Sequence, residues 1–139
     1  MNARNLATII DTNAILALLD RNDRNHLQAR SVLPTKLLIP SVVLPEVDYL
    51  ASTRLGNMVA RAFLRSVVRG DMEIIHSVDA DILRSLELQD QYADLNLGLV
   101  DSTIIAIAER LGIQRVFTFD RRHFSVVRPK NLEYLELLP

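Results

Sequence analysis

The sequence contains no cysteine and no tryptophan, and only four of its 139 residues are glycine. The absence of cysteine excludes disulfides, thiolate metal sites and cysteine nucleophiles. It agrees with a reducing compartment, so we expect a cytoplasmic protein. No apolar run is long enough to cross a membrane. Because Asp11 interrupts the only apolar stretch near the start, we also expect no signal peptide.

A strong charge of either sign is also missing, because the formal net charge is −1. The sequence therefore lacks the overall positive charge that is typical of many nucleic-acid-binding proteins. The basic residues are nevertheless uneven, with 14 arginines and only two lysines. Arginine suits bidentate contacts to phosphate, although genomic base composition explains this bias equally well. A divalent cation held by acidic residues would also make a site more attractive to anions than the formal charge suggests.

Strands and helices are predicted to alternate along the whole chain. This pattern predicts an α/β fold, with a mostly parallel central sheet of four to five strands and helices on both faces. The length fits one domain over residues 1–139. The predicted strands are Leu6–Ile10, Leu37–Ile39, Met72–Ile75, Val116–Phe119 and Leu132–Leu135. The predicted helices are about Asn13–Leu19, His26–Leu33, Val42–Arg54, Asn57–Val68, Ala80–Tyr92 and Val100–Leu111.

One stretch near the start predicts both a buried strand and the position of a site. The apolar run Leu6–Ile10 predicts a strand buried on both faces, and it stops at Asp11. Thr12 or Asn13 is a suitable N-cap for the helix that follows. Asp11 therefore lies where a buried strand ends, at the sheet edge where ligands bind in open α/β folds.

Three more acidic residues fall at comparable positions, so four carboxylates are expected at this edge. They are Asp11, Glu46, Asp101 and Asp120. Two like charges about 4 Å apart repel by roughly 4 kcal/mol at an effective dielectric near 20, so the group needs protons or a cation. Oxygen ligands without histidine or cysteine favour Mg²⁺ or Mn²⁺, or else Ca²⁺. The chemistry that follows is metal-assisted attack of water on a phosphodiester.

Three motifs around these acids resemble those of PIN-domain ribonucleases. They are Ile9–Asn13, Leu99–Ile104 with Ala106 and Ala108–Gly112 after it, and Thr118–Phe124. Glu46 matches the second acid of that family, and the resemblance covers nearly the whole chain in the right order. It implies a three-layer α/β/α fold. The size resembles that of the small VapC-type toxins of toxin–antitoxin pairs.

The resemblance implies an endoribonuclease that depends on Mg²⁺ or Mn²⁺, with RNA as substrate, a cognate antitoxin as partner and a homodimeric assembly. It makes the four acids catalytic residues and metal ligands. Four polar residues would orient these acids or contact substrate phosphate: Thr12, Asn13, Ser102 and Thr118. Arg121 and Arg122 are further substrate-binding candidates, since they follow a presumed ligand.

Other functions remain open at this stage. The same motifs fit an RNA-processing nuclease without an antitoxin, and the fold also fits a non-catalytic module that binds RNA or protein. A phosphatase with an aspartate nucleophile is a fourth alternative. That class needs a second aspartate two positions after Asp11, where this chain has Asn13.

Several polar residues are predicted to have structural roles. Surface, turn or capping positions are expected for Asp48, Asp79, Asp81 and Asp94, and surface or partly buried positions for His26 and His76. His123 could contact substrate, but packing beside Phe124 is at least as plausible. Arg61, Arg65 and Arg69 follow one helix face, which is a solvated face by default and otherwise a contact for RNA phosphates or acidic parts of an antitoxin.

Overall fold

The strand that precedes Asp11 lies at the centre of the sheet. The computed structural model describes residues 7–139, which contain a five-stranded sheet in the order β3-β2-β1-β4-β5. All four strand pairings are parallel, as the sequence predicts. The strands are β1 (Ala7–Ile10), β2 (Lys36–Pro40), β3 (Glu73–Ile75), β4 (Arg115–Phe117) and β5 (Glu136–Leu138). Leu6, the predicted first residue of the first strand, lies outside the described residues.

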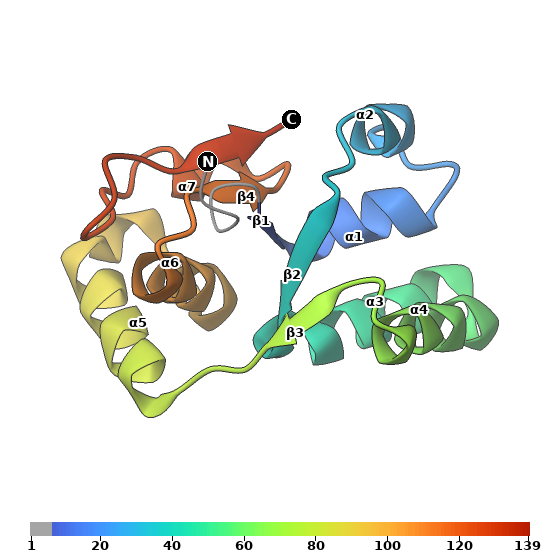
Figure 1. Cartoon of the computed structure of the whole chain (residues 1–139), viewed down its shortest axis with the longest axis horizontal. Helices are drawn as coiled ribbons and strands as arrows, with labels where there is room; N and C mark the ends of the chain where they lie inside the picture. The colour runs from blue at the N-terminus through green and yellow to red at the C-terminus, as the bar shows by residue number, and fades with distance from the viewer. Residues whose placement is uncertain (1–6) are drawn as a thin grey trace.

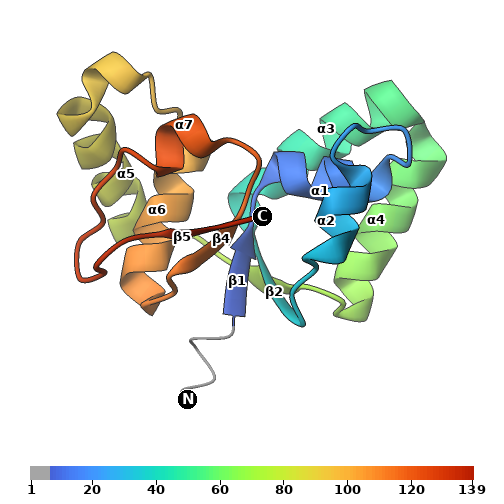
Figure 2. The same ribbon diagram turned by 90° about the horizontal axis from the view of Figure 1, so that it is seen from above.

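Helices cover both faces of the sheet, which confirms the predicted three layers. Figures 1 and 2 show α1–α4 on one side of the strands and α5–α7 on the other. The first group is α1 (Thr12–Leu19), α2 (His26–Ser31), α3 (Leu44–Leu55) and α4 (Asn57–Arg69). The second is α5 (Asp79–Gln91), α6 (Leu99–Leu111) and α7 (Arg121–Phe124). Two short 3₁₀ turns, η2 (Ser41–Val43) and η3 (Ala93–Leu95), join neighbouring elements.

The strand order reverses next to β1. The chain moves outward from β1 to β2 and β3, and then returns to the other side of β1 to form β4 and β5. Right-handed crossovers in opposite directions put their helices on opposite faces, which accounts for the two helical layers. At such a reversal the carboxyl ends of the two adjacent strands leave a crevice where α/β proteins bind ligands. Here the two strands are β1 and β4.

The apolar core joins this central strand to α6. All four residues of β1 are buried, and so is the α6 segment from Ser102 to Ala108. A helix that is apolar over most of its surface must be covered on most sides, and α6 packs between the sheet and α5. Gly112 ends α6 in the left-handed conformation (φ 66°), the C-terminal role that the sequence predicts for it.

Some predicted boundaries and caps are wrong. The fifth strand is Glu136–Leu138 rather than Leu132–Leu135, because pairing with β4 selects this segment while Leu132 and Leu135 pack on the core without joining the sheet. The N-cap of α1 is Asp11, not Thr12 or Asn13. Asp79 does not cap α5, because Val78 occupies the cap position and its N–H donates to Asp81.

Two further differences concern short segments near the site. The helix predicted from Val42 begins at Leu44, after the 3₁₀ turn, and Pro45 is tolerated in its first turn because it has no N–H to leave unpaired. The helix α7, over Arg121–Phe124, was not predicted because four residues are too few to show a helical period.

Two ion pairs hold α5 against α6. Asp81 is almost fully buried, and Arg110 donates to both of its carboxylate oxygens at 2.9–3.2 Å. Arg84 does the same to Glu109 at 2.8–3.3 Å. Both pairs join residues more than 20 positions apart, so they fix α6, which carries Asp101, relative to its neighbour.

Replacing Arg110 by methionine should therefore destabilise the fold. The side chain keeps its length, but the buried Asp81 carboxylate loses its partner. We expect the free energy of unfolding to fall by about 2 kcal/mol, less than for a fully buried pair because Arg110 is partly exposed. Urea unfolding measures this change. Arg69→Met is the matched control, since its pair with Asp71 is exposed and should contribute little. Equal effects of the two substitutions would contradict the structural role of Asp81.

Candidate metal centre

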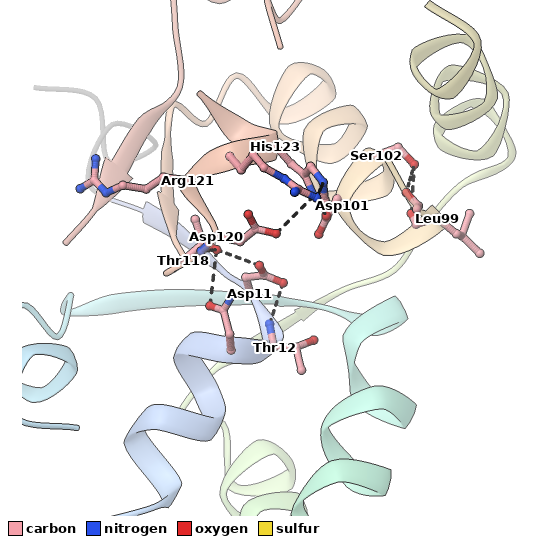
Figure 3. Close-up of polar contacts among 12 residues, drawn as sticks. Asp11, Thr12, Leu99, Asp101, Ser102, Thr118, Asp120, Arg121 and His123 are labelled. Carbon is pink, nitrogen blue, oxygen red and sulfur yellow. Dashed lines mark hydrogen bonds and ion pairs between the residues drawn. The ribbon is translucent and has the colours of Figure 1, made fainter. Parts of the chain in front are cut away.

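A pocket of about 270 Å³ lies at the carboxyl ends of β1 and β4, where the strand order reverses. All four acids singled out from the sequence line it, together with five other residues. The lining residues are Asp11, Thr12, Asn13, Leu16, Glu46, Leu50, Arg54, Asp101 and Asp120. The topology therefore brings together four carboxylates that come from separate parts of the chain. Figure 3 shows three of them, Asp11, Asp101 and Asp120.

Asp11 is the most constrained of these acids. It follows β1 directly, and its backbone N–H donates to the Phe117 carbonyl, which extends the pairing with β4. One carboxylate oxygen accepts the Thr12 N–H at 2.7 Å, and the other accepts the Thr118 hydroxyl at 2.8 Å. Only 4% of Asp11 is exposed. The residue thus caps α1 and joins the ends of the two strands.

The other three acids approach from three helices. Glu46 lies in the first turn of α3 and is exposed. Asp101 lies in the first turn of α6 and is partly buried, and Asp120 is the N-cap residue of α7. The N-termini of α3 and α6 also bring the positive ends of their helix dipoles to this pocket.

Burial and mutual repulsion raise the pKa values of two of these acids. The pKa of Asp11 rises from 3.8 to about 6, first because the group is buried and then because Asp101 is close. Burial also raises the pKa of Asp101, although its contact with His123 acts in the opposite direction. The ionised pocket is therefore unfavourable by itself, and a divalent cation would relieve it.

His123 lies among the carboxylates, which the sequence did not establish. Its Nδ1 is 2.7 Å from Oδ2 of Asp101 and 3.2 Å from Oδ2 of Asp120 (Figure 3). Asp101, Asp120 and His123 each offer one ligand atom, and within residues 7–139 these atoms form a group in which all lie within 4.8 Å of one another. The sequence predicts only a substrate contact or packing beside Phe124 for His123, because the helix that brings it to these acids, α7, was not predicted.

The side chains fit a divalent cation. Carboxylate oxygens predominate, as Mg²⁺ and Mn²⁺ prefer. In addition, Thr12 lines the pocket, and its hydroxyl is buried with no hydrogen-bond partner in the described part of the chain. A buried polar atom of this kind calls for a partner such as an ion-bound water.

The polar residues predicted to orient the acids fall into two groups. Thr118 donates to Asp11, and Asn13 accepts the Phe119 N–H at 2.9 Å, so both lie in the hydrogen-bonded network below the pocket. Ser102 is different, because it faces α5. Its hydroxyl lies 2.5 Å from that of Ser85 and donates to the Gly98 carbonyl. Ser102 therefore holds the first turn of α6 and does not contribute to the pocket surface.

The arginines near the site have different surroundings, and the substrate contacts of Arg121 and Arg122 stay a prediction. Arg121 and Arg122 do not line the pocket: Arg121 donates to the Pro139 carbonyl, and Arg122 lies beside His123. The pocket contains Arg54 instead. Arg54 is eight residues after Glu46 on α3, and this two-turn spacing was the available signal for it.

The fold and the pocket together define a class of protein: an α/β domain with acidic residues gathered where the strand order of its parallel sheet reverses. The model of the PIN domain matches residues 8–129, and the chain belongs to the PIN-domain family. It is similar to Ribonuclease VapC26 of Mycobacterium tuberculosis, with 32% identity over 124 residues, which cover 87% of this chain and 92% of the relative.

Solved structures show the same fold. Mycobacterium tuberculosis VapC20, described as a Sarcin-Ricin loop cleaving toxin, has a TM-score of 0.81 at 22% identity and covers 95% of this chain and 99% of its own. DNA-bound VapBC from Salmonella typhimurium has a TM-score of 0.70 at 21% identity. The match covers 95% of this chain and 98% of that one. The resemblance seen in the motifs is thus confirmed.

The raised pKa of Asp11 predicts how stability depends on pH. The folded state favours protonated Asp11, so this contribution is complete below pH 4 and is lost as the pH rises through about 6. The loss is about 3 kcal/mol, from the difference between the two pKa values. Asp11→Asn should remove this part of the pH dependence and make the protein more stable at pH 7. Urea unfolding between pH 4 and 8 with a chelator present measures it.

The control for this experiment is Asp48→Asn, because Asp48 is exposed on α3 and does not line the pocket. It should keep the pH dependence of the wild-type protein. An Asp11→Asn variant with the same pH dependence as the wild type would contradict the assigned effect of burial.

Proposed function

We propose that this protein is a metal-dependent endoribonuclease and the toxin of a type II toxin–antitoxin pair. The observation that carries the proposal is the pocket at the junction of β1 and β4, which gathers Asp11, Glu46, Asp101 and Asp120. The identity of 32% to Ribonuclease VapC26 supports RNA as the substrate. We propose Mg²⁺ or Mn²⁺ as the ion, because the donors are mainly carboxylate oxygens.

A bound ion would supply activated water and offset charge on the phosphodiester as its bond to the leaving oxygen breaks. The residues of the chain hold and orient the reacting groups. Asp11 provides a buried carboxylate and Asp101 a partly buried one, and Thr118 fixes the orientation of Asp11 by donating to it. Arg54, at the edge of the pocket, provides a positive charge for a substrate phosphate.

Asn13 argues against the phosphatase alternative. Its side-chain oxygen accepts the Phe119 N–H, so it serves to position the chain after β4. An amide in this position cannot transfer the proton that an aspartate nucleophile mechanism needs.

We also propose that an antitoxin partner binds this protein. Solved neighbours include the DNA-bound VapBC complex of Salmonella typhimurium and a toxin–antitoxin complex of Klebsiella pneumoniae. A surface on α4 is suited to a partner segment that is both apolar and acidic. Its lining residues are Arg61, Leu64, Arg65, Val68 and Arg69. In the described part of the chain no helix is long and apolar enough to span a membrane. We propose a cytoplasmic location because RNA is the substrate.

RNA cleavage tests the main proposal. The wild-type protein should cleave RNA with Mg²⁺ or Mn²⁺ and stop when a chelator is added. Asp101→Asn and Glu46→Gln should each lower the rate at least about 100-fold, because each removes a negative ligand near the reacting phosphate. Gel analysis of labelled RNA measures the rate, and circular dichroism checks that the variants are folded.

Asp48→Asn is the matched control, because Asp48 is an exposed carboxylate two residues after Glu46 on the same helix. It should cleave RNA at the wild-type rate. Cleavage that persists in the chelator and in Asp101→Asn would show that the activity comes from elsewhere, and the proposal would then fail.

We further propose that two copies form a homodimer through α5. This helix lies at the outside of the molecule (Figure 2). Val78, Ile82 and Leu86 are spaced four residues apart along it and are 44%, 56% and 55% exposed. An exposed apolar stripe of this kind is typical of an interface.

Leu86→Arg should therefore convert the dimer to a monomer, because two like charges would meet across the interface. Size-exclusion chromatography with light scattering measures the mass. Leu27→Arg is the control, since Leu27 is 80% exposed on α2 and lies outside the stripe. A monomeric wild-type protein, or a Leu86→Arg variant that remains dimeric, would exclude this interface.

A further inference from the structure

A metal centre made of carboxylates alone would not need His123 where it lies. Four acids already line the pocket, yet the chain adds an imidazole beside two of them. His123 lies in α7, three residues after the N-cap residue Asp120, and its Nδ1 is 3.2 Å from Oδ2 of Asp120. Asp101 comes to them from the first turn of α6. Figure 3 shows the three side chains pointing toward one another.

Two of the three spacings among these ligand atoms, both from His123, match those around one ion, and all three atoms lie within 4.8 Å of one another. Nδ1 of His123 lies 2.7 Å from Oδ2 of Asp101 and 3.2 Å from Oδ2 of Asp120. Adjacent ligands around a six-coordinate ion with bonds of about 2.1 Å are about 3 Å apart, so the two distances bracket the required value. Without an ion, a proton between Nδ1 and Asp101 accounts for the shorter distance, and an ion would take the place of that proton.

We propose that His123 is a metal ligand through Nδ1, together with Asp101 and Asp120, and that it makes the centre select Mn²⁺ over Mg²⁺. The proposal rests on the metal-dependent function proposed above and adds the class of ion. Mg²⁺ prefers oxygen ligands and keeps its waters, whereas first-row transition ions accept imidazole readily. A pocket of carboxylates alone would not discriminate in this way.

The rest of the site is compatible with this role. His123 is partly buried, so its ring is held in place while one side remains accessible. Its other ring nitrogen, Nε2, lies 3.4 Å from the guanidinium of Arg122. The proposal requires Arg122, which is exposed, to turn away so that Nε2 carries the ring proton when Nδ1 binds an ion.

Pulsed electron paramagnetic resonance of Mn²⁺ bound to the full-length protein tests the assignment directly. The wild-type protein should show a coupling between Mn²⁺ and an imidazole nitrogen. His123→Asn should lose this coupling, and His76→Asn should retain it, because His76 is an exposed residue after β3. The remaining histidine, His26, is buried, and its Nδ1 contacts the Ala17 carbonyl.

Calorimetric titration with each ion gives the selectivity. His123→Asn should weaken Mn²⁺ binding about tenfold, while Mg²⁺ binding changes by less than about twofold. Equal losses for both ions, or Mn²⁺ bound to the wild type without nitrogen coupling, would overturn the assignment of His123 and leave the carboxylate centre intact. If the wild type binds neither ion, the proposed metal-dependent function fails as well.

Discussion

Repulsion among carboxylates in a partly buried pocket is the constraint around which this structure is organised. Asp11 is almost completely removed from water, and Asp101 is close enough to raise its pKa further. Such an arrangement lowers the stability of the metal-free fold, so other parts of the molecule must offset it. Hydrogen bonds from Thr12 and Thr118 stabilise the Asp11 carboxylate directly. The apolar core around β1 and α6 stabilises the fold as a whole.

The topology explains how distant segments reach one pocket. Each acid comes from the end of a strand or the start of a helix, and all these points lie at the carboxyl edge of one parallel sheet. Helix packing then sets the remaining distances. Asp101 is held by α6, which is fixed in turn by Ser102, the Asp81–Arg110 pair and the Arg84–Glu109 pair. Residues far from the pocket therefore determine its geometry.

Much of this arrangement could be predicted from the sequence because the signals are local. An apolar run that stops at Asp11, and an apolar helix with Asp101 in its first turn, indicate both the sheet edge and its acids. The roles of Ser102 and His123 could not be predicted, since both depend on which way a side chain faces across two packed elements. The segment Leu132–Leu135 is apolar at both ends and resembles a strand, but its leucines only pack partly buried against the core. Pairing with β4 selects the segment after it.

The pairing of β1 with β4 has a consequence for synthesis of the chain. Thr118 contacts Asp11 across 107 positions of sequence, and β5 joins the sheet only through β4. A nascent chain that still lacks its last two strands has no Thr118 to donate to Asp11 and no Asp120. The acidic pocket is therefore completed only after nearly the whole domain has been synthesised, and the ribosome carries an unfinished site until β4 and the segment after it have emerged.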